Sequence, residues 1–267
     1  MTAAAATFDE LLPYRIVRPH RVRFEEATAQ ETMRTAIFLA WAADTAWQHS
    51  TLLGFDREWY SARGMFWLVR AVRLDVFAPV RTYETAYMST QVVGYRRVAA
   101  RRHSEVRDDA GALVAALEID WVMTNERGFP ARVPDEMLRF VADDATFELL
   151  RVELPPVPPD AFEVRIRVPR RDLDPLAHVN NSVYLDYLEE TLAAAGDSEL
   201  LAAVPRRYEV DFRAAAEHGD TVVGRTWPDG DARAFLLCRE DGLELFRGRV
   251  SRLQAGDGTA QPPPRGR

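Results

Sequence analysis

The sequence holds a single cysteine, Cys238, which lies within the apolar run Phe235–Cys238. One cysteine cannot form an internal disulfide, and no cluster of Cys and His residues has the spacing of a zinc site. We therefore expect Cys238 to be a small buried strand residue. We expect neither a metal site nor a cofactor.

Positive charges are outnumbered by negative ones, and the apolar runs are short. Lys and Arg number 34 against 41 Asp and Glu, a formal net charge of −7 that argues against general nucleic-acid binding. The most apolar stretch, residues 36–43, is shorter than the roughly 20 residues that cross a bilayer. The start, MTAAAATFDELL, lacks the charged and apolar segments of a secretory signal. These features predict a cytoplasmic protein with neither a membrane nor a nucleic acid as partner.

Proline is concentrated in one internal stretch, residues 153–160, which reads ELPPVPPD. Such a segment is incompatible with a helix or a central strand and favours a stiff extended connector. It predicts an N-terminal module at 1–150, a linker at 151–160 and a C-terminal module at 161–255. The remaining tail, 256–267, is polar and rich in Pro and Gly, so we expect it to be disordered.

Hydrophobic periodicity gives both halves the same order of elements: a short strand, a helix and four strands. The expected ranges are 21–24, 32–53, 65–77, 82–93, 96–107 and 113–124 in the first half, and 164–167, 181–195, 206–213, 220–226, 232–240 and 243–250 in the second. The first helix is apolar nearly all round, which is typical of a buried helix. We predict an α+β fold of two units that meet edge to edge, each a curved antiparallel sheet wrapped round one helix, with the linker crossing outside.

The densest polar cluster is DLDPLAHVNNSVYLDYLEE, residues 172–190, just before the second helix. The first amides of a helix have no intrahelical partner and carry partial positive charge, so they can hold a thioester carbonyl and the oxyanion formed on attack. A carboxylate beside them can activate water or act as a nucleophile. The alternative is structural: Asn180 and Asn181 cap the helix, and the aspartates form turns.

This run resembles the signature of hotdog-fold thioesterases. The first half adds the segments GFDREWY, GMFWLVRAVRLDVFAPV, TQVVGYRRVAARRHSEVRD and ALEIDWVMTNERGFPARVPDEM, which resemble the amino-terminal module of acyl-ACP thioesterases of plants and bacteria. The resemblance implies two tandem hotdog modules packed as an internal dimer. It also implies that the first module holds the acyl chain and that the second carries the catalytic residues.

By this resemblance Asp174 and His178 are the catalytic residues, and Asn180 and Asn181 contact the substrate. Two positions depart from the family pattern: Leu176 stands where the family has asparagine, and Ala215 where it has glutamate. Laying 23–43 on 170–190 without gaps places Ala27 opposite Asp174 and Glu31 opposite His178. We therefore expect one site per chain.

The first helix and the sheet around it carry several tryptophans. We expect Trp41 and Trp67 to line the acyl tunnel and to contact the substrate, with ordinary core packing as the alternative. Four arginine pairs, at 96–97, 101–102, 170–171 and 206–207, are candidates for a basic patch that binds an acidic carrier protein or anionic coenzyme A. The alternative is that they lie on solvated strand faces.

The expected function is hydrolysis of fatty acyl thioesters, with acyl-ACP preferred over acyl-CoA. The replacements at Leu176 and Ala215 leave a second function open, an acyl-binding or acyl-shuttling protein with weak or no hydrolysis. A hotdog dehydratase is less favoured, because its different histidine-containing motif is not found. A homodimer is compatible with the sequence.

Overall fold

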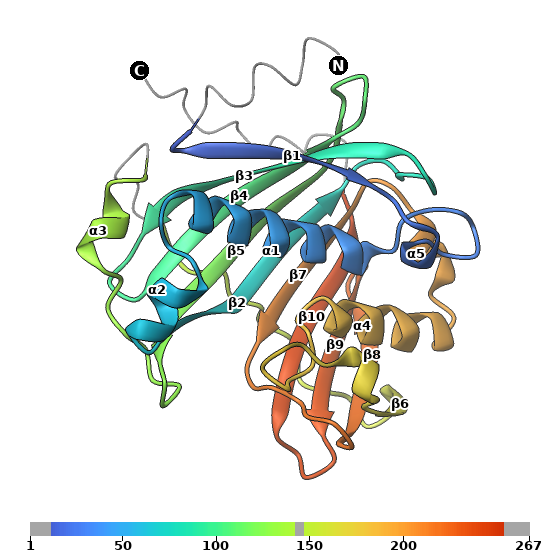
Figure 1. The fold of residues 1–267 in the computed structure, drawn as a ribbon. Coiled ribbons are helices and arrows are strands. Elements are labelled where there is room, and N and C mark those ends of the chain that lie inside the picture. The colour runs from blue at the N-terminus through green and yellow to red at the C-terminus, as the bar shows by residue number, and fades with distance from the viewer. Residues whose placement is uncertain (1–11, 142–146, 254–267) are drawn as a thin grey trace.

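One antiparallel sheet dominates the computed structural model, which describes residues 12–141 and 147–253 (Figure 1). Its strand order is β1-β3-β4-β5-β2-β7-β10-β9-β8-β6. The strands are β1 (Arg15–Arg21), β2 (Met65–Val76), β3 (Thr85–Tyr95), β4 (Ala99–Arg107), β5 (Leu113–Asn125), β6 (Phe162–Arg167), β7 (Arg206–Phe212), β8 (Thr221–Asp229), β9 (Ala232–Arg239) and β10 (Glu244–Arg252).

Two main helices lie on the same side of this sheet (Figure 1). They are α1 (Thr35–Leu52) and α4 (Val183–Ala194); the shorter ones are α2 (Arg57–Ala62), α3 (Asp135–Leu138) and α5 (Ser198–Ala202), with 3-10 turns η3 (Phe24–Glu26) and η4 (Arg170–Asp172). Eleven of the 18 residues of α1 are buried, as expected for a helix that is apolar nearly all round. One continuous core of buried apolar residues joins both main helices to the sheet.

The two halves of the sheet have the same internal order and meet at a single strand pair. Module 1 (β1–β5 with α1–α3) ends at β2, and module 2 (β6–β10 with α4 and α5) ends at β7. These two strands pair antiparallel from Ala71 opposite Asp211 to Val76 opposite Arg206. The predicted α+β fold of two helix-plus-sheet units that meet edge to edge is confirmed.

The chain passes from module 1 to module 2 over the face of the sheet away from α1. The backbone N of Leu150 donates to Asp120 Oδ2 at 2.6 Å, and Arg247 Nη1 donates to the carbonyl of Val152 at 3.4 Å. Asp120 follows Ile119 on β5, and Ile119 belongs to the core, so Asp120 points to the opposite face. Leu150 and Val152 therefore lie on the outer face of the sheet. The module boundaries themselves stay predictions, and the tail lies outside the described residues.

The first strand was predicted at the wrong place. The structure has β1 at 15–21, whereas residues 24–26 form a 3-10 turn in which the backbone N of Arg23 donates to Glu26 Oε2. Pro19 hides the strand in the sequence because proline lacks the N–H of a sheet ladder. It is tolerated here because β1 is an edge strand that pairs only with β3.

Candidate active site

Asp174 lies in a tight loop, residues 173–179, that leads into α4. The backbone N of Asp174 donates to the carbonyl of His178 at 2.8 Å, and the N of Ala177 donates to the carbonyl of Asp174 at 3.0 Å. Ala177 has φ of 63°, the left-handed region that non-glycine residues rarely adopt, so the loop holds a specific conformation. Its ends are joined by a bridge between Leu173 and Val179.

The Asp174 carboxylate is held at one oxygen. Its Oδ1 accepts from the backbone N of Leu176 at 2.8 Å and from that of His178 at 3.3 Å. No residue of the described ranges donates a hydrogen bond to Oδ2, and the side chain is half-buried. The loop amides thus fix the carboxylate while one oxygen stays available for a water molecule or a carbonyl carbon.

His178 is brought close to Asp174 through the backbone. Its main chain pairs with Glu217, and its side chain is exposed. Within the described ranges the imidazole has neither a hydrogen bond nor an ion pair. Leu176 is 53% exposed and Ala215 is also exposed, so both departures from the family pattern place an apolar side chain at the surface.

The two asparagines lie at the start of α4. Asn180 Oδ1 accepts from the backbone N of Ser182 at 3.0 Å and from its hydroxyl at 2.9 Å. This is a local turn contact. The capping role that the sequence left open for the asparagines is not seen, because the N-cap of α4 is Ser182 and it has no side-chain cap hydrogen bond. Asn181 stands next to it at the helix entrance, two residues before Val183, the first helical residue.

Two tyrosines of α4, Tyr184 and Tyr187, bind residues next to this loop. Tyr187 donates from its hydroxyl to Asp172 Oδ2 at 2.6 Å, and the Tyr184 hydroxyl accepts from the backbone N of Ala216 at 2.9 Å. Burial, with smaller contributions from nearby carboxylates that include Asp174, raises the pKa of Tyr184 to about 12. Burial, and then Asp172, also raises the pKa of Tyr187, so both hydroxyls stay protonated and tie Asp172 and Ala216 to α4.

The site lies beside the junction of the two modules. Arg34, just before α1, donates from Nη1 to both oxygens of Asp186 in the first turn of α4, at 2.8 Å each. Arg206 donates to Thr35 Oγ1 at 3.1 Å, and Tyr208 donates to Glu189. Desolvation raises the pKa of Asp186 and of Glu189, and the arginines oppose that shift.

Module 1 repeats the loop without the carboxylate. The backbone N of Thr28 donates to the carbonyl of Thr32 at 2.7 Å, as Asp174 does to His178. Glu31 has φ of 59° and is the equivalent of Ala177. The gap-free pairing of Ala27 with Asp174 and of Glu31 with His178 was therefore wrong by one position. Hydrogen bonds, and not a hydrophobic period, set the conformation of a loop, so the sequence could not fix the alignment of the two loops. A threonine hydroxyl replaces the aspartate, and the expectation of one site per chain stays.

The two tryptophans proposed for substrate contact lie in module 1, apart from the Asp174 loop. Trp41 is 5% exposed in the main core and stacks on His20, with ring centroids 4.7 Å apart. Trp67 donates from Nε1 to the Tyr60 hydroxyl at 3.0 Å and packs on a second apolar cluster under α2 and α3. Both positions agree with core packing, and contact with an acyl chain stays a prediction.

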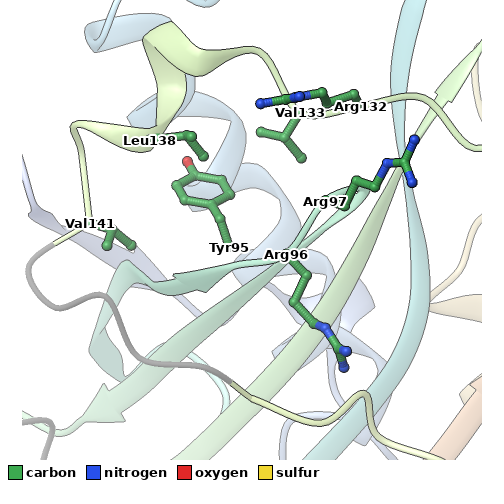
Figure 2. Close-up of a pocket in the computed structure, with 7 residues that line it drawn as sticks. All are labelled: Tyr95, Arg96, Arg97, Arg132, Val133, Leu138 and Val141. Carbon is green, nitrogen blue, oxygen red and sulfur yellow. The ribbon is translucent and has the colours of Figure 1, made fainter.

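A surface pocket of about 360 Å³ opens in module 1 between the end of β3 and α3 (Figure 2). It is lined by Tyr95, Arg96, Arg97, Arg132, Val133, Leu138 and Val141. None of these residues belongs to the Asp174 loop. Over the described ranges no three His, Cys, Asp or Glu side chains gather closely enough to hold a metal ion, and no helix is long and apolar enough to span a membrane.

Two of the arginines proposed for a basic patch are bound by carboxylates. Arg101 makes an ion pair with the buried Asp120 at 2.7 Å, and Arg207 pairs with Asp75 at 2.6 Å. These two side chains are bound by carboxylates, so they do not belong to a solvated strand face. Arg170 and Arg171 are exposed next to the Asp174 loop.

Three solved structures share this fold over most of their length. A putative oleoyl thioesterase from Lactobacillus plantarum has a TM-score of 0.76 at 20% identity, covering 90% of this chain and 97% of that one. An acyl-ACP thioesterase from Bacteroides thetaiotaomicron has a TM-score of 0.76 at 15% identity, covering 89% and 97%. The 12:0-ACP thioesterase from Umbellularia californica has a TM-score of 0.73 at 18% identity, covering 89% and 96%.

Sequence models define the family. Residues 14–141 match the acyl-ACP thioesterase N-terminal domain, and residues 158–236 match the acyl-ACP thioesterase C-terminal domain. The chain belongs to the acyl-ACP thioesterase family and is a thioester hydrolase. No curated protein matches its sequence.

Proposed function

We propose that this protein hydrolyses fatty acyl thioesters, acyl-ACP in preference to acyl-CoA, at Asp174. The observation that carries the proposal is the Asp174 carboxylate, which two loop amides hold at one oxygen beside the start of α4. Asp172 does not fit the role equally well, because its Oδ2 is already bound by the hydroxyl of Tyr187.

In this mechanism Asp174 takes a proton from water as the water oxygen attacks the thioester carbonyl carbon. The C–S bond then breaks, the leaving sulfur takes up the proton, and a free acid and a thiol result. Amides at the start of α4 stabilise the oxyanion, which one well-placed donor can favour by about 3 kcal/mol. Direct attack by Asp174, through an acyl-enzyme anhydride that water then cleaves, is the alternative route.

Module 1 is proposed to hold the acyl chain. The protein that carries the chain is proposed to dock at the exposed Arg170 and Arg171, which lie beside the loop. An acidic carrier protein offers many carboxylates to such a patch, whereas coenzyme A offers a few phosphates, so acyl-ACP is the expected substrate. A cytoplasmic location is part of the same proposal.

The test is turnover of Asp174→Asn on acyl-ACP and acyl-CoA of matched chain length. An amide can neither take a proton from water nor attack the thioester, so kcat should fall by a factor of about 10² to 10⁴ while binding is retained. His178→Ala should cost less, because its imidazole makes no contact with Asp174 in the described structure.

The outcomes separate the competing functions. An acyl-binding protein with faded chemistry would show no thiol release to lose. Asp174→Asn that turns over as fast as the parent would refute the assignment of the site, and a larger loss in His178→Ala would make the histidine the base. Equal kcat/KM for the two carriers would refute the preference for acyl-ACP.

A further inference from the structure

One inward position of module 1 is polar where the equivalent position of module 2 is apolar. Equivalent positions follow from the ladders, because Val22 N donates to Glu84 O in module 1 as Val168 N does to Asp220 O in module 2. Counting along β3 and β8 from these residues makes Thr90 the equivalent of Thr226. Thr90 lies opposite Ser104 and Thr226 lies opposite Phe235, so Ser104 is the equivalent of Phe235.

The replacement of a phenylalanine by a serine changes what fills the interior. Phe235 is fully buried in module 2 and packs against Phe246 with ring centroids 5.9 Å apart. In module 1 the Ser104 hydroxyl instead donates to Thr90 Oγ1 at 3.0 Å. The smaller side chain occupies much less volume between the sheet and α1.

The next inward positions on the same strands hold one arginine in each module. Arg233, opposite Pro228, makes an ion pair with Asp197 at 2.7 Å just after α4. Arg102, opposite Val92, is its equivalent in module 1. Arg102 has no carboxylate within ion-pair distance in residues 12–141 and 147–253.

Arg102 contacts a neutral histidine in place of an acid. Its Nη1 donates to His49 Nδ1 at 3.1 Å, while His49 Nε2 donates to the carbonyl of Pro13 at 2.8 Å. Burial, and then the nearby Arg102, lowers the pKa of His49 to about 4, so the imidazole stays neutral at neutral pH. A guanidinium has five N–H donors. Within the described residues, one of the five donors of Arg102 makes a hydrogen bond, the one to His49.

Two tyrosines, Tyr60 and Tyr95, lie within electrostatic reach of this cation. Tyr60 exchanges a hydrogen bond of 2.9 Å with Ser50 and accepts one from Trp67. Tyr95 lies within electrostatic reach of Arg102 and also lines the pocket of Figure 2. Arg102 itself is partly buried, in contact with the fully buried His49.

We propose that Arg102 is a specificity-determining residue that binds an oxygen acceptor, foremost a carboxylate, on the distal part of the acyl chain. The inference rests on the proposal that module 1 holds that chain. A guanidinium inside an apolar module is costly unless an acceptor or anion satisfies it. A plain alkyl end leaves those donors unpaired, and sites built to hydrogen-bond a substrate group reject analogues that lack it.

The experiment measures binding of non-hydrolysable pantetheine thioethers by calorimetry. Three chains of equal length are compared, ending in a methyl, a hydroxyl or a carboxylate. The wild-type protein should bind the carboxylate at least about 10-fold more tightly than the methyl, with the hydroxyl between, as expected for a hydrogen bond to a charged group. Arg102→Met should remove the preference and strengthen binding of the methyl chain.

Arg233→Met is the matched control, because it removes the equivalent arginine of module 2 and should leave the preference unchanged. Arg102→Lys keeps the charge and should retain part of the preference. Equal or tighter binding of the methyl chain by the wild type would overturn the role of Arg102, as would an unchanged preference in Arg102→Met. Loss of the preference in Arg233→Met would also overturn it.

Binding of a thioether does not depend on hydrolysis, so this result is separate from the fate of Asp174. Binding of all three chains with equal affinity would overturn the inference alone. Failure of every chain to bind would overturn both the inference and the acyl-binding role of module 1.

Discussion

At the scale of single residues, the tyrosine hydroxyls of α4 have partners that hydrophobic periodicity does not reveal. Tyr184 and Tyr187 recur at helical spacing with leucines, and periodicity alone treats them as core. Each buried tyrosine hydroxyl needs a hydrogen-bond partner, and here the partners are the backbone N of Ala216 and the carboxylate of Asp172. The polar run 172–190 could be found from the sequence. The choice of Asp174 over Asp172 is supported by geometry that only the fold supplies.

His49 should make stability depend on pH. Its folded pKa of about 4 lies below its ordinary value of 6.5, because burial and Arg102 disfavour the imidazolium. Above pH 6.5 both states are neutral and the full stability is present. As pH falls from 6.5 towards 4, the unfolded state binds a proton that the folded state does not, so stability should fall by about 3 kcal/mol.

Urea unfolding followed between pH 4 and pH 7.5 measures this dependence. His49→Gln, which keeps a side-chain amide near Arg102 but cannot titrate, should flatten the curve in that window. His218→Gln is the control, because His218 is exposed and should leave the curve as it is. A wild-type stability that does not change between pH 6.5 and 4 would contradict the buried, neutral state of His49.

At the scale of elements, the two main helices and the four strands that follow each could be predicted because their hydrophobic periods are long and regular. The observed ends of these elements differ from the predicted ones by a few residues. The first helix begins at Thr35 and not at residue 32, since Thr32 pairs with Arg81 in a bridge. The edge strand β1 could not be placed, because an edge strand needs only one partner and tolerates Pro19. The inward positions of Ser104 and Arg102 were also missed, since Arg102 sits in a run of arginines that looks like a solvated face.

Helix α1 should set the length of the acyl chain. Ala46 is 7% exposed and lies one turn before His49 and Ser50, on the inward side of the helix. Ala46→Leu adds bulk to that interior and should reduce kcat/KM for the longest accepted chains more than for the shortest. The substitution should also cost about 1 to 3 kcal/mol of stability through overpacking.

The measurement is a chain-length profile of kcat/KM on matched acyl-ACPs. Ala43→Leu makes the same chemical change on the same helix at a partly exposed position, and its profile should match the wild type. An unchanged profile in a folded Ala46→Leu protein, or the same change in both variants, would refute the placement of the chain beside this face of α1.

At the scale of the whole molecule, one seam joins the modules into a single sheet. Strand β2 pairs with β7 through six positions, and Arg207–Asp75 and Arg73–Glu209 bridge the same strands on the outer face. On the inner side Arg34 binds Asp186 across the two helices. The sequence predicted two units but not this pairing, because strand partners are long-range contacts that no local pattern encodes. The seam also removes an exposed edge from each module, and such edges favour aggregation.

The covalent linker should therefore be dispensable once the chain has folded. A protease site inserted between Val157 and Pro158 lies in a stretch that is largely exposed, after the segment that packs on the sheet. Cleavage should leave the two pieces associated in gel filtration and should keep acyl binding, because the paired strands and the shared core stay in place. Melting of the cleaved protein should become concentration-dependent, since unfolding now releases two chains. The intact insertion protein without protease is the control. Pieces that separate in native buffer would show that the linker, and not the β2–β7 seam, holds the modules together.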